Sequence, residues 1–356
     1  MTDGIVNFCS DNVAGAAPEI MEALARAGQG AAMPYGNDDW TRRVERRLAE
    51  VFECDLAAFP VATGTAANVL GLSLLAPAYG AIYCHAGAHI HEDECGAPEF
   101  FTGGAKLIAL EGAHGKLDPD RLAGAIAGAG DVHHVQPAAV SLSQATEAGT
   151  VYRPQEVAAI AEVARGHGLG LQMDGARFAN ALVAAGCSPA ELTWKAGVDV
   201  LAFGATKNGA LAAEAVLVFR PALAADFGYR RKRGGHLFSK MRFLSAQLEA
   251  YLADDLWLRH AANANAMAAR LAAGLAALPG VVLRHPVEAN EIFAGLPLAL
   301  ADGLEAAGFQ FYRWPTLEAG LAELRLVTAF STTEAEVERF LAAVRRLAET
   351  PLRSAG

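Results

Sequence analysis

The sequence lacks paired cysteines, an excess of basic residues and an uninterrupted hydrophobic run. Its five cysteines are odd in number and scattered without regular spacing: Cys9, Cys54, Cys84, Cys95 and Cys187. This pattern excludes a disulfide framework and is typical of a reducing compartment. The net charge of -10 argues against a nucleic-acid-binding protein, because such proteins usually carry a basic face.

No segment has the composition of a membrane span or a leader. The most apolar stretch, residues 61–84, carries no charge, but polar residues, glycine and proline interrupt it. A spanning helix needs ~20 predominantly apolar residues, so we expect buried core here. The chain opens with Thr2-Asp3-Gly4, without a basic leader or an apolar signal core. We therefore expect a cytoplasmic protein with no membrane partner.

Apolar runs alternate with amphipathic segments, which predicts an α/β protein with a largely parallel sheet. The length of 356 residues suits two domains, and 53% hydrophobic with 19% charged residues is typical of a folded protein. We predict a large domain over residues 1–250 and a small α+β domain over residues 251–356.

The predicted elements follow this division. In the large domain we expect strands at residues 56–61, 169–173 and 198–203, and helices at residues 41–52, 66–75 and 154–165. A long helical region follows at residues 243–278. After it we expect short strands near residues 281–284, 291–296, 309–313 and 324–328, and a last helix that starts at the capping box from Thr333 to Glu336.

Three candidate features occur where predicted strands end, which is where ligands bind in open α/β sheets. The turn at residues 62–65 precedes a helix, and its backbone N–H groups suit a phosphate. Alone, Asp174 could be a helix N-cap, and Lys207 a strand-end lysine that reaches solvent. Together with Arg177, however, these features offer handles for the phosphate, the pyridine nitrogen and the aldehyde of pyridoxal phosphate.

Three further groups keep alternative interpretations. The histidines and acids of residues 85–95 could bind a metal, or one imidazole could stack on a flat cofactor ring, or they could be surface and capping residues. No second ligand cluster is evident, so we predict no metal. Arg325 lies within an apolar strand, where a buried guanidinium needs a carboxylate. That carboxylate could be a structural acid or the α-carboxylate of an amino acid. The basic run at residues 230–236 could be a solvated surface or could approach an anionic cofactor.

These residues resemble the low-specificity L-threonine aldolases, which belong to the aspartate-aminotransferase-like fold type I of pyridoxal-phosphate enzymes. The resemblance runs nearly end to end, and its motifs are specific as a set. They are Phe8-Cys9-Ser10-Asp11-Asn12, Tyr35-Gly36-Asn37-Asp38, Gly64-Thr65-Ala66-Ala67-Asn68, Asp93-Glu94-Cys95-Gly96-Ala97-Pro98-Glu99-Phe100-Phe101, Met173-Asp174-Gly175-Ala176-Arg177-Phe178 and Thr206-Lys207-Asn208-Gly209. The fold that this implies has a mainly parallel, seven-stranded sheet in the large domain.

The resemblance implies how pyridoxal 5'-phosphate is held. Lys207 would form a Schiff base with the cofactor and act as a catalytic residue. Asp174 would pair with the pyridine nitrogen, and Arg177 would contact the ring hydroxyl oxygen. Gly64 and Thr65 would bind the phosphate.

Other roles implied by the resemblance concern the substrate and the partner subunit. His89 would stack on the cofactor ring near the substrate hydroxyl, and it is our candidate base. Ser10 and Arg325 would receive the substrate carboxylate. Tyr35 would close the site from a partner subunit in a homotetramer built from dimers, and Lys240 would be a phosphate ligand.

The implied activity is a lyase reaction, the retro-aldol cleavage of L-threonine, L-allo-threonine and related β-hydroxy-α-amino acids such as phenylserine to glycine and an aldehyde. Many relatives read Glu-Asn-Thr-His where this chain reads Gln144-Ala145-Thr146-Glu147, so a second active-site histidine is missing. The group that takes the hydroxyl proton is thus left open. The alternatives are a β-eliminating lyase or a racemase on the same scaffold, or a non-catalytic cofactor-binding protein.

Overall fold

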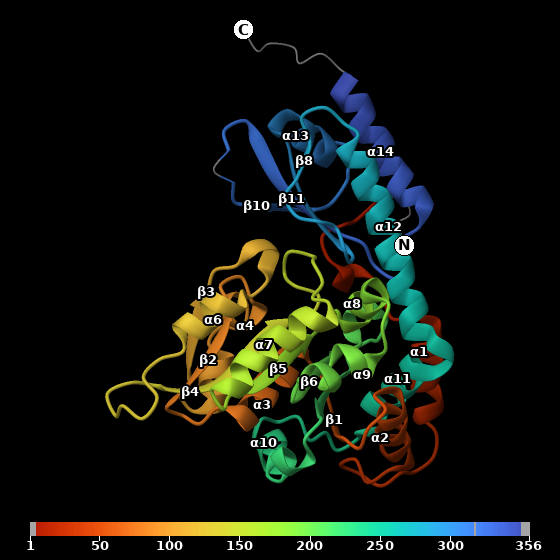
Figure 1. The fold of residues 1–356 in the computed structure, drawn as a ribbon. Coiled ribbons are helices and arrows are strands. Elements are labelled where there is room, and N and C mark those ends of the chain that lie inside the picture. Colours follow the sequence, from red (N-terminus) through yellow and green to blue (C-terminus); the bar gives the residue numbers. More distant parts are fainter. Residues whose placement is uncertain (1–4, 317, 350–356) are drawn as a thin grey trace.

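The computed structural model describes residues 5–316 and 318–349, so residues 2–4 of the opening segment lie outside the described residues. A seven-stranded sheet with helices on both faces fills the lower part of Figure 1, and a four-stranded sheet backed by helices fills the upper part. No helix in the described ranges is both long and apolar enough to cross a membrane.

The large sheet has the strand order β1-β7-β6-β5-β4-β2-β3 and is mainly parallel. Among these strands, β7 alone runs antiparallel to its neighbours β1 and β6, whereas the other neighbouring pairs are parallel. This confirms the predicted α/β architecture. The strands are β1 (Ala57–Val61), β2 (Gly80–His85), β3 (Lys106–Leu110), β4 (Gln136–Ser143), β5 (Gly170–Gly175), β6 (Val200–Gly204) and β7 (Glu214–Val218).

Both faces of the large sheet are buried. In β6, Leu201 and Phe203 join the core formed with α7 and α8, whereas Val200 and Ala202 join the core formed with α3. Burial on both faces explains why residues 200–203 of β6 are continuously apolar rather than alternating. The helices of this part are α1 (Pro18–Ala27), α2 (Asp39–Val51), α3 (Gly64–Leu75), α4 (His89–Glu92), α5 (Ala97–Thr102), α6 (Pro119–Ala125), α7 (Pro154–Gly166), α8 (Phe178–Ala185), α9 (Pro189–Leu192) and α10 (Phe227–Arg233).

Helix α3 begins two residues earlier than the periodicity predicts, at Gly64 instead of Ala66. The reason is local, because the side chain of Thr63 accepts a hydrogen bond from the backbone N–H of Ala66 at 3.2 Å and so acts as the N-cap. Gly64 and Thr65 therefore form the first turn of the helix. The described residues also contain six short 3₁₀ helices: η1 (Asp11–Val13), η2 (Ala113–Gly115), η3 (Trp194–Ala196), η4 (Thr206–Asn208), η5 (Pro221–Ala224) and η6 (Ala253–Asp255).

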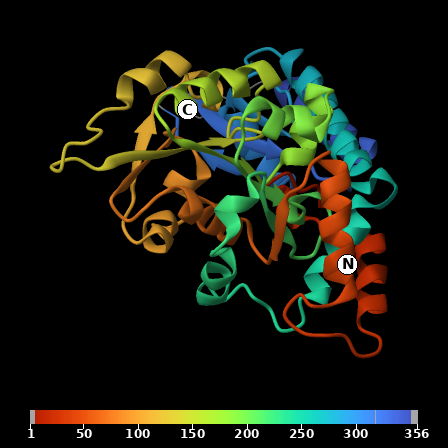
Figure 2. The same cartoon turned by 60° about the horizontal axis from the view of Figure 1, so that its bottom comes forward.

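The long helical region expected at residues 243–278 is two helices, α11 (Arg242–Leu252) and α12 (Leu256–Ala276). They are separated at η6, where Asp254 and Asp255 have φ angles of 49° and 54°, which interrupts a right-handed helix. As a result, α11 packs against α1 and α2 at one edge of the molecule, as Figure 2 shows.

The smaller sheet is antiparallel, with the order β10-β11-β9-β8. Val6 and Phe8, from the N-terminal end of the described chain, lie in its core. Helix α12 contributes Trp257 to the first core and Met267 to the second. The division at residue 250 stays a prediction. The elements here are β8 (Val282–Leu283), β9 (Glu291–Pro297), β10 (Tyr312–Trp314), β11 (Leu321–Val327), α13 (Leu298–Ala306) and α14 (Glu334–Glu349).

Candidate active site

A cavity of about 890 Å³ lies beyond the carboxyl ends of the large-sheet strands, between that sheet and the smaller one. Residues that follow β2, β4, β5 and β6 line one side, and residues of the smaller sheet line the other. The structure brings together five of the side chains predicted from the sequence: Ser10, His89, Arg177, Lys207 and Arg325. Lys207 lines this crevice, whereas Asp174 is not among the described lining residues and is linked to it through Asn68, Glu94 and His89. That Asp174 itself faces the crevice stays a prediction.

Asp174 lies at the end of β5 and is 5% exposed. Its carboxylate accepts hydrogen bonds from Asn68 Nδ2 at 2.8 Å and from the backbone N–H of Ala176 at 3.0 Å. Asn68 Nδ2 also donates to Glu94 Oε1 at 2.9 Å, and the same oxygen lies 2.9 Å from His89 Nδ1. This hydrogen bond to Glu94 raises the pKa of His89. Within the described residues Asp174 has hydrogen-bond donors but no ion-pair partner, so it can receive a cationic group.

His89, Glu94 and Asp174 have ligand atoms within 4.8 Å of one another, the one such group of metal-binding type among the described residues. The amide of Asn68, however, donates to both carboxylates, and His89 Nδ1 faces Glu94. The three side chains that could bind a metal are thus already engaged in hydrogen bonds with Asn68 and with one another. These bonds orient Asp174 and His89 and occupy carboxylate oxygens that a cation would need. His91 lies outside this group and is hydrogen-bonded to the backbone oxygen of Ala86.

Lys207 lies in η4, directly after β6, and two features hold this turn. A Cβ atom at Gly204 would lie 2.6 Å from the backbone oxygen of Ala176, so only glycine lets the end of β6 approach the end of β5 this closely. On the other side, the buried carboxylate of Glu214 accepts from the backbone N–H groups of Ala205 and Thr206, at 3.3 Å each. Burial raises the pKa of Glu214 to about 7.

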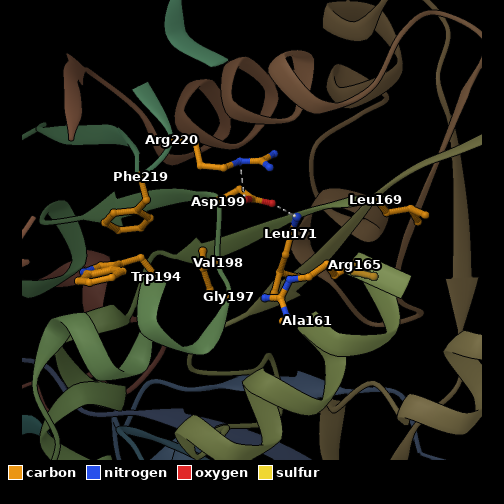
Figure 3. A pocket seen from close by; sticks show the side chains of 11 residues that line it. Ala161, Arg165, Leu169, Leu171, Trp194, Gly197, Val198, Asp199, Phe219 and Arg220 are labelled. Atoms are coloured by element: carbon orange, nitrogen blue, oxygen red, sulfur yellow. Dashed lines mark hydrogen bonds and ion pairs between the residues drawn. The ribbon is translucent and has the colours of Figure 1, made fainter. Parts of the chain in front are cut away.

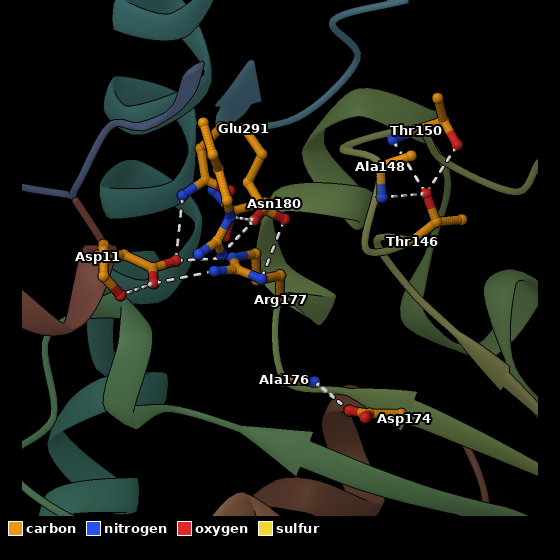
Figure 4. A network of polar contacts seen from close by, with 12 residues as sticks. Asp11, Thr146, Ala148, Thr150, Asp174, Ala176, Arg177, Asn180 and Glu291 are labelled. Carbon is orange, nitrogen blue, oxygen red and sulfur yellow. Dashed lines mark hydrogen bonds and ion pairs between the residues drawn. The ribbon is translucent and has the colours of Figure 1, made fainter. Parts of the chain in front are cut away.

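Arg177 and Arg325 belong to one buried network, part of which Figure 4 shows. Arg177 donates to both oxygens of Asp11, at 2.7 and 3.1 Å, and its Nη1 lies 3.0 Å from Glu291 Oε2. Arg325 donates to Glu291 Oε1 through Nε at 3.1 Å and Nη2 at 2.7 Å. Burial would lower the pKa of Arg177, but the charges of Asp11 and Glu291 raise it above its usual range. Arg325 therefore has a structural carboxylate and still lines the cavity.

The structure does not bring Tyr35 and Lys240 to Lys207. They line a separate hollow together with Ala62, which precedes the first turn of α3. Beside Gly64 there is open space, since an added Cβ atom would meet no other atom within 4 Å. As the first residues of a helix, Gly64 and Thr65 present N–H groups that the helix itself cannot satisfy.

Three comparisons with known proteins agree with this geometry. The family model described as beta-eliminating lyase matches residues 7–296. The chain is 45% identical to the low specificity L-threonine aldolase of a Pseudomonas species over 97% of this chain and 99% of that protein, and 48% identical to that of Pseudomonas aeruginosa over 88% and 90%. It also superimposes on a solved threonine aldolase structure from Leishmania major with a TM-score of 0.91 and 31% identity, over 96% of this chain and 99% of that one.

The chain belongs to the low-specificity L-threonine aldolases. It therefore has the pyridoxal-phosphate fold type I and is a lyase, as the sequence predicts.

Pyridoxal 5'-phosphate is the cofactor of these aldolases, and the residues present fit it. The buried Asp174 has no ion-pair partner within the described residues, which suits a protonated pyridine nitrogen. Lys207 can hold the aldehyde, and the open first turn of α3 can hold the phosphate. Asn68, one turn of α3 after Thr65, donates to Asp174, so one helix would connect a phosphate held at its first turn with the carboxylate that would face the ring nitrogen.

Four acids and amides of this site had no role in the sequence-based prediction: Asp11, Asn68, Glu94 and Glu291. Three of them lie inside motifs of the threonine aldolase family, which was the available signal. Glu291 lies in none of those motifs, and only the pairing of β9 with β11 brings it to Arg325.

A smaller hollow of about 250 Å³ lies at the other end of the large-sheet strands, near the amino ends of β5 and β6, and is shown in Figure 3. Its acid is already paired, since Asp199 lies 2.8 Å from Arg220 Nε and accepts from the backbone N–H of Leu171 at 2.8 Å. We assign this hollow no chemistry.

Proposed function

We propose that this aldolase cleaves L-threonine, L-allo-threonine and related β-hydroxy-α-amino acids such as phenylserine to glycine and an aldehyde. The observation that carries the proposal is the convergence of Lys207 and the Asp174–His89 network on a cavity that also contains a guanidinium, Arg325. A cofactor handle and a carboxylate receptor in one cavity are what an amino-acid substrate requires.

The residues around Lys207 would each hold a different part of the cofactor. Bound pyridoxal phosphate supplies the electron-accepting ring for the pair released when the Cα–Cβ bond breaks. Lys207 would hold it through the amine, Asp174 would keep a proton on the pyridine nitrogen, and His89 would pack against the ring. Arg177, held by Asp11 and Glu291, would contact the ring hydroxyl oxygen.

Arg325 and Ser10 receive the substrate carboxylate. Arg325 uses Nε and Nη2 for Glu291, which leaves Nη1 for the substrate. Fixing the carboxylate orients the Cα–Cβ bond relative to the cofactor ring and so selects the bond that breaks. The exposed fraction of the Arg325 side chain is 14%, so little solvent competes for this contact.

We further propose a homotetramer in the cytoplasm, with a large domain at residues 1–250 and a small domain at residues 251–356. Tyr35 and Lys240 lie away from the Lys207 cavity of their own chain, next to exposed apolar side chains such as Leu211 and Phe238. This arrangement supports their use at a subunit interface, where Lys240 would approach a phosphate. Sedimentation at four times the chain mass of 37.1 kDa is expected, and a monomer would contradict it.

The activity is tested with Lys207→Ala and L-threonine. The wild type is expected to be yellow and to release glycine and acetaldehyde. Lys207→Ala is expected to lose the yellow band and at least about 10²-fold in kcat, because no other amine replaces it. Lys195→Ala is the matched control, since that lysine is exposed and pairs with Glu53 at 2.6 Å.

Other products would refute the proposal. A 2-oxo acid with ammonia would indicate a β-eliminating lyase, and D-configured product would indicate a racemase. Bound cofactor without turnover in the wild type would indicate a non-catalytic protein. Normal cleavage by Lys207→Ala would remove Lys207 from the mechanism.

A further inference from the structure

Glu147 is a carboxylate of the cavity that the roles above leave without a function. It follows β4 and lines the same cavity as Lys207 and His89. Its side chain is half-buried, and among the described residues it has no hydrogen-bond or ion-pair partner. Carboxylates that are partly buried in a cavity usually have a hydrogen-bond or ion-pair partner in the protein. One that has none is available to a bound substrate.

The backbone around Glu147 is held firmly, as the right-hand side of Figure 4 shows. The hydroxyls of Thr146 and Thr150 lie 2.8 Å apart, and both donate to the backbone oxygen of His114, at 3.2 and 2.7 Å. The Thr146 hydroxyl also accepts from the backbone N–H of Ala148 at 3.3 Å. Glu147 thus projects from a fixed turn, which is what a positioned acid–base group needs.

The surrounding charges suit Glu147 to accept a proton. Burial raises the pKa of its carboxyl above the ordinary value, the nearby charges of Glu291 and Asp174 raise it further, and Lys207 and Arg177 oppose this rise. A base whose pKa lies nearer to neutral pH accepts a proton more strongly than an ordinary carboxylate does.

His89 is less suited to the same task. Its Nδ1 lies 2.9 Å from Glu94, and this hydrogen bond raises the pKa of the imidazole although burial opposes the rise; the charges of Asp174 and Glu147 add smaller contributions. A larger fraction of the imidazole is therefore protonated near neutral pH, and a protonated ring has no free acceptor. His89 is therefore better suited to pack on the cofactor ring than to take a proton from the substrate.

We propose that Glu147 is the catalytic base that takes the proton of the substrate β-hydroxyl group, an assignment that rests on the aldolase activity proposed above. The proton passes from the hydroxyl oxygen to a Glu147 carboxylate oxygen. The electron pair of the O–H bond becomes the second bond of the aldehyde carbonyl, and the pair of the Cα–Cβ bond stays on the Cα side, where a proton later completes glycine. Glu147 returns its proton to solvent after the aldehyde leaves.

The test separates hydroxyl chemistry from the other steps. Glu147→Gln is compared with wild type in two assays: cleavage of L-threonine, and exchange of the glycine Cα hydrogen in deuterated water followed by NMR. Glycine has no hydroxyl, so its exchange needs the cofactor, Lys207 and the carboxylate receptor but not Glu147. We expect cleavage to fall about 10²–10⁴-fold and glycine exchange to stay within about threefold.

Two additional variants complete the test. Glu92→Gln is the matched control, because Glu92 lines the same cavity but is exposed and pairs with His91 at 2.8 Å. It should leave both assays unchanged. Glu147→His, which restores a base at this position, should cleave at least about tenfold faster than Glu147→Gln. In the wild type, kcat/KM should fall at low pH as Glu147 becomes protonated, and this acid limb should be absent from Glu147→Gln.

Each opposite result overturns the assignment. These results are cleavage by Glu147→Gln within about tenfold of wild type with the same acid limb, equal losses of cleavage and glycine exchange, or no recovery in Glu147→His. If the wild type itself formed no glycine and aldehyde from L-threonine, the proposed aldolase activity would fail instead, which distinguishes the two ideas.

Discussion

Replacing Arg177 should have a large effect on the free energy of unfolding, because its guanidinium compensates the charges of two buried acids. The exposed fractions of the side chains are 3% for Arg177, 1% for Asp11 and 0% for Glu291. In Arg177→Met the aliphatic volume is largely kept, but Asp11 loses its ion pair and Glu291 keeps only Arg325. Removing one partner of a buried pair costs about 3–5 kcal/mol, since a buried charge is left uncompensated.

This cost should be visible as a lower melting temperature. For a chain of this size it corresponds to a decrease on the order of 10 °C. Thermal unfolding is followed by circular dichroism after removal of the cofactor, so that a change in cofactor affinity does not contribute, and is repeated with cofactor present. Arg313→Met is the matched control, because that arginine pairs with the exposed Asp302 and Glu305. Exposed pairs contribute at most about 1 kcal/mol.

The pH dependence gives a second check. Burial alone would raise the pKa of Asp11, but Arg177 holds it below the usual range. The pair therefore stabilises the wild type above the unfolded pKa of about 3.9, and this contribution is lost as the pH falls through the lower folded pKa. In Arg177→Met the largest charge that lowers the pKa of Asp11 is gone and only Lys207 and Asn290 still oppose burial, so uptake of a proton relieves part of the penalty. The gap in melting temperature to wild type should shrink from about pH 8 to about pH 5.

The reasoning is refuted if Arg177→Met is no less stable than Arg313→Met at neutral pH. It is also refuted if the gap to wild type widens as the pH is lowered, since an uncompensated acid can only be relieved by protonation.

Three other substitutions test the site and its scaffold. Asp174→Asn should keep the cofactor's yellow band but lose about 10²-fold in kcat, because a neutral amide cannot hold a proton on the ring nitrogen; unchanged kcat would contradict this. Gly204→Ala should be destabilised by about 1–3 kcal/mol and bind cofactor more weakly in a spectroscopic titration, because its Cβ would meet the backbone of Ala176. Tyr152→Phe should lower the free energy of unfolding by about 1–3 kcal/mol in urea titrations, since its hydroxyl is the acceptor for the buried N–H of Leu117 at 2.6 Å; no loss would mean that another acceptor replaces it.

Local patterns in the sequence were sufficient for some of the elements, among them the strands that precede Asp174 and Lys207. The strands predicted at residues 169–173 and 198–203 correspond to β5 and β6. Burial on both faces favours apolar residues at most of their positions. The rule that ligands bind beyond the carboxyl ends of strands in open α/β sheets predicts that Asp174 and Lys207 lie at one crevice. The interruption between α11 and α12 could not be predicted, since Asp254 and Asp255 carry no local signal as strong as glycine or proline for the left-handed region.

The sequence by itself determined the α/β class and, through its motifs, the aldolase family and its cofactor. Only the tertiary structure decided which polar and charged side chains contact one another. Asn68 and Asp174 are 106 positions apart, and Asp11 and Arg177 are 166 apart. Such contacts depend on how helices and sheets pack and not on local periodicity. For the same reason, only the fold shows that Glu94 engages His89 while Glu147 has no partner among the described residues, and this difference is what points to the proton acceptor.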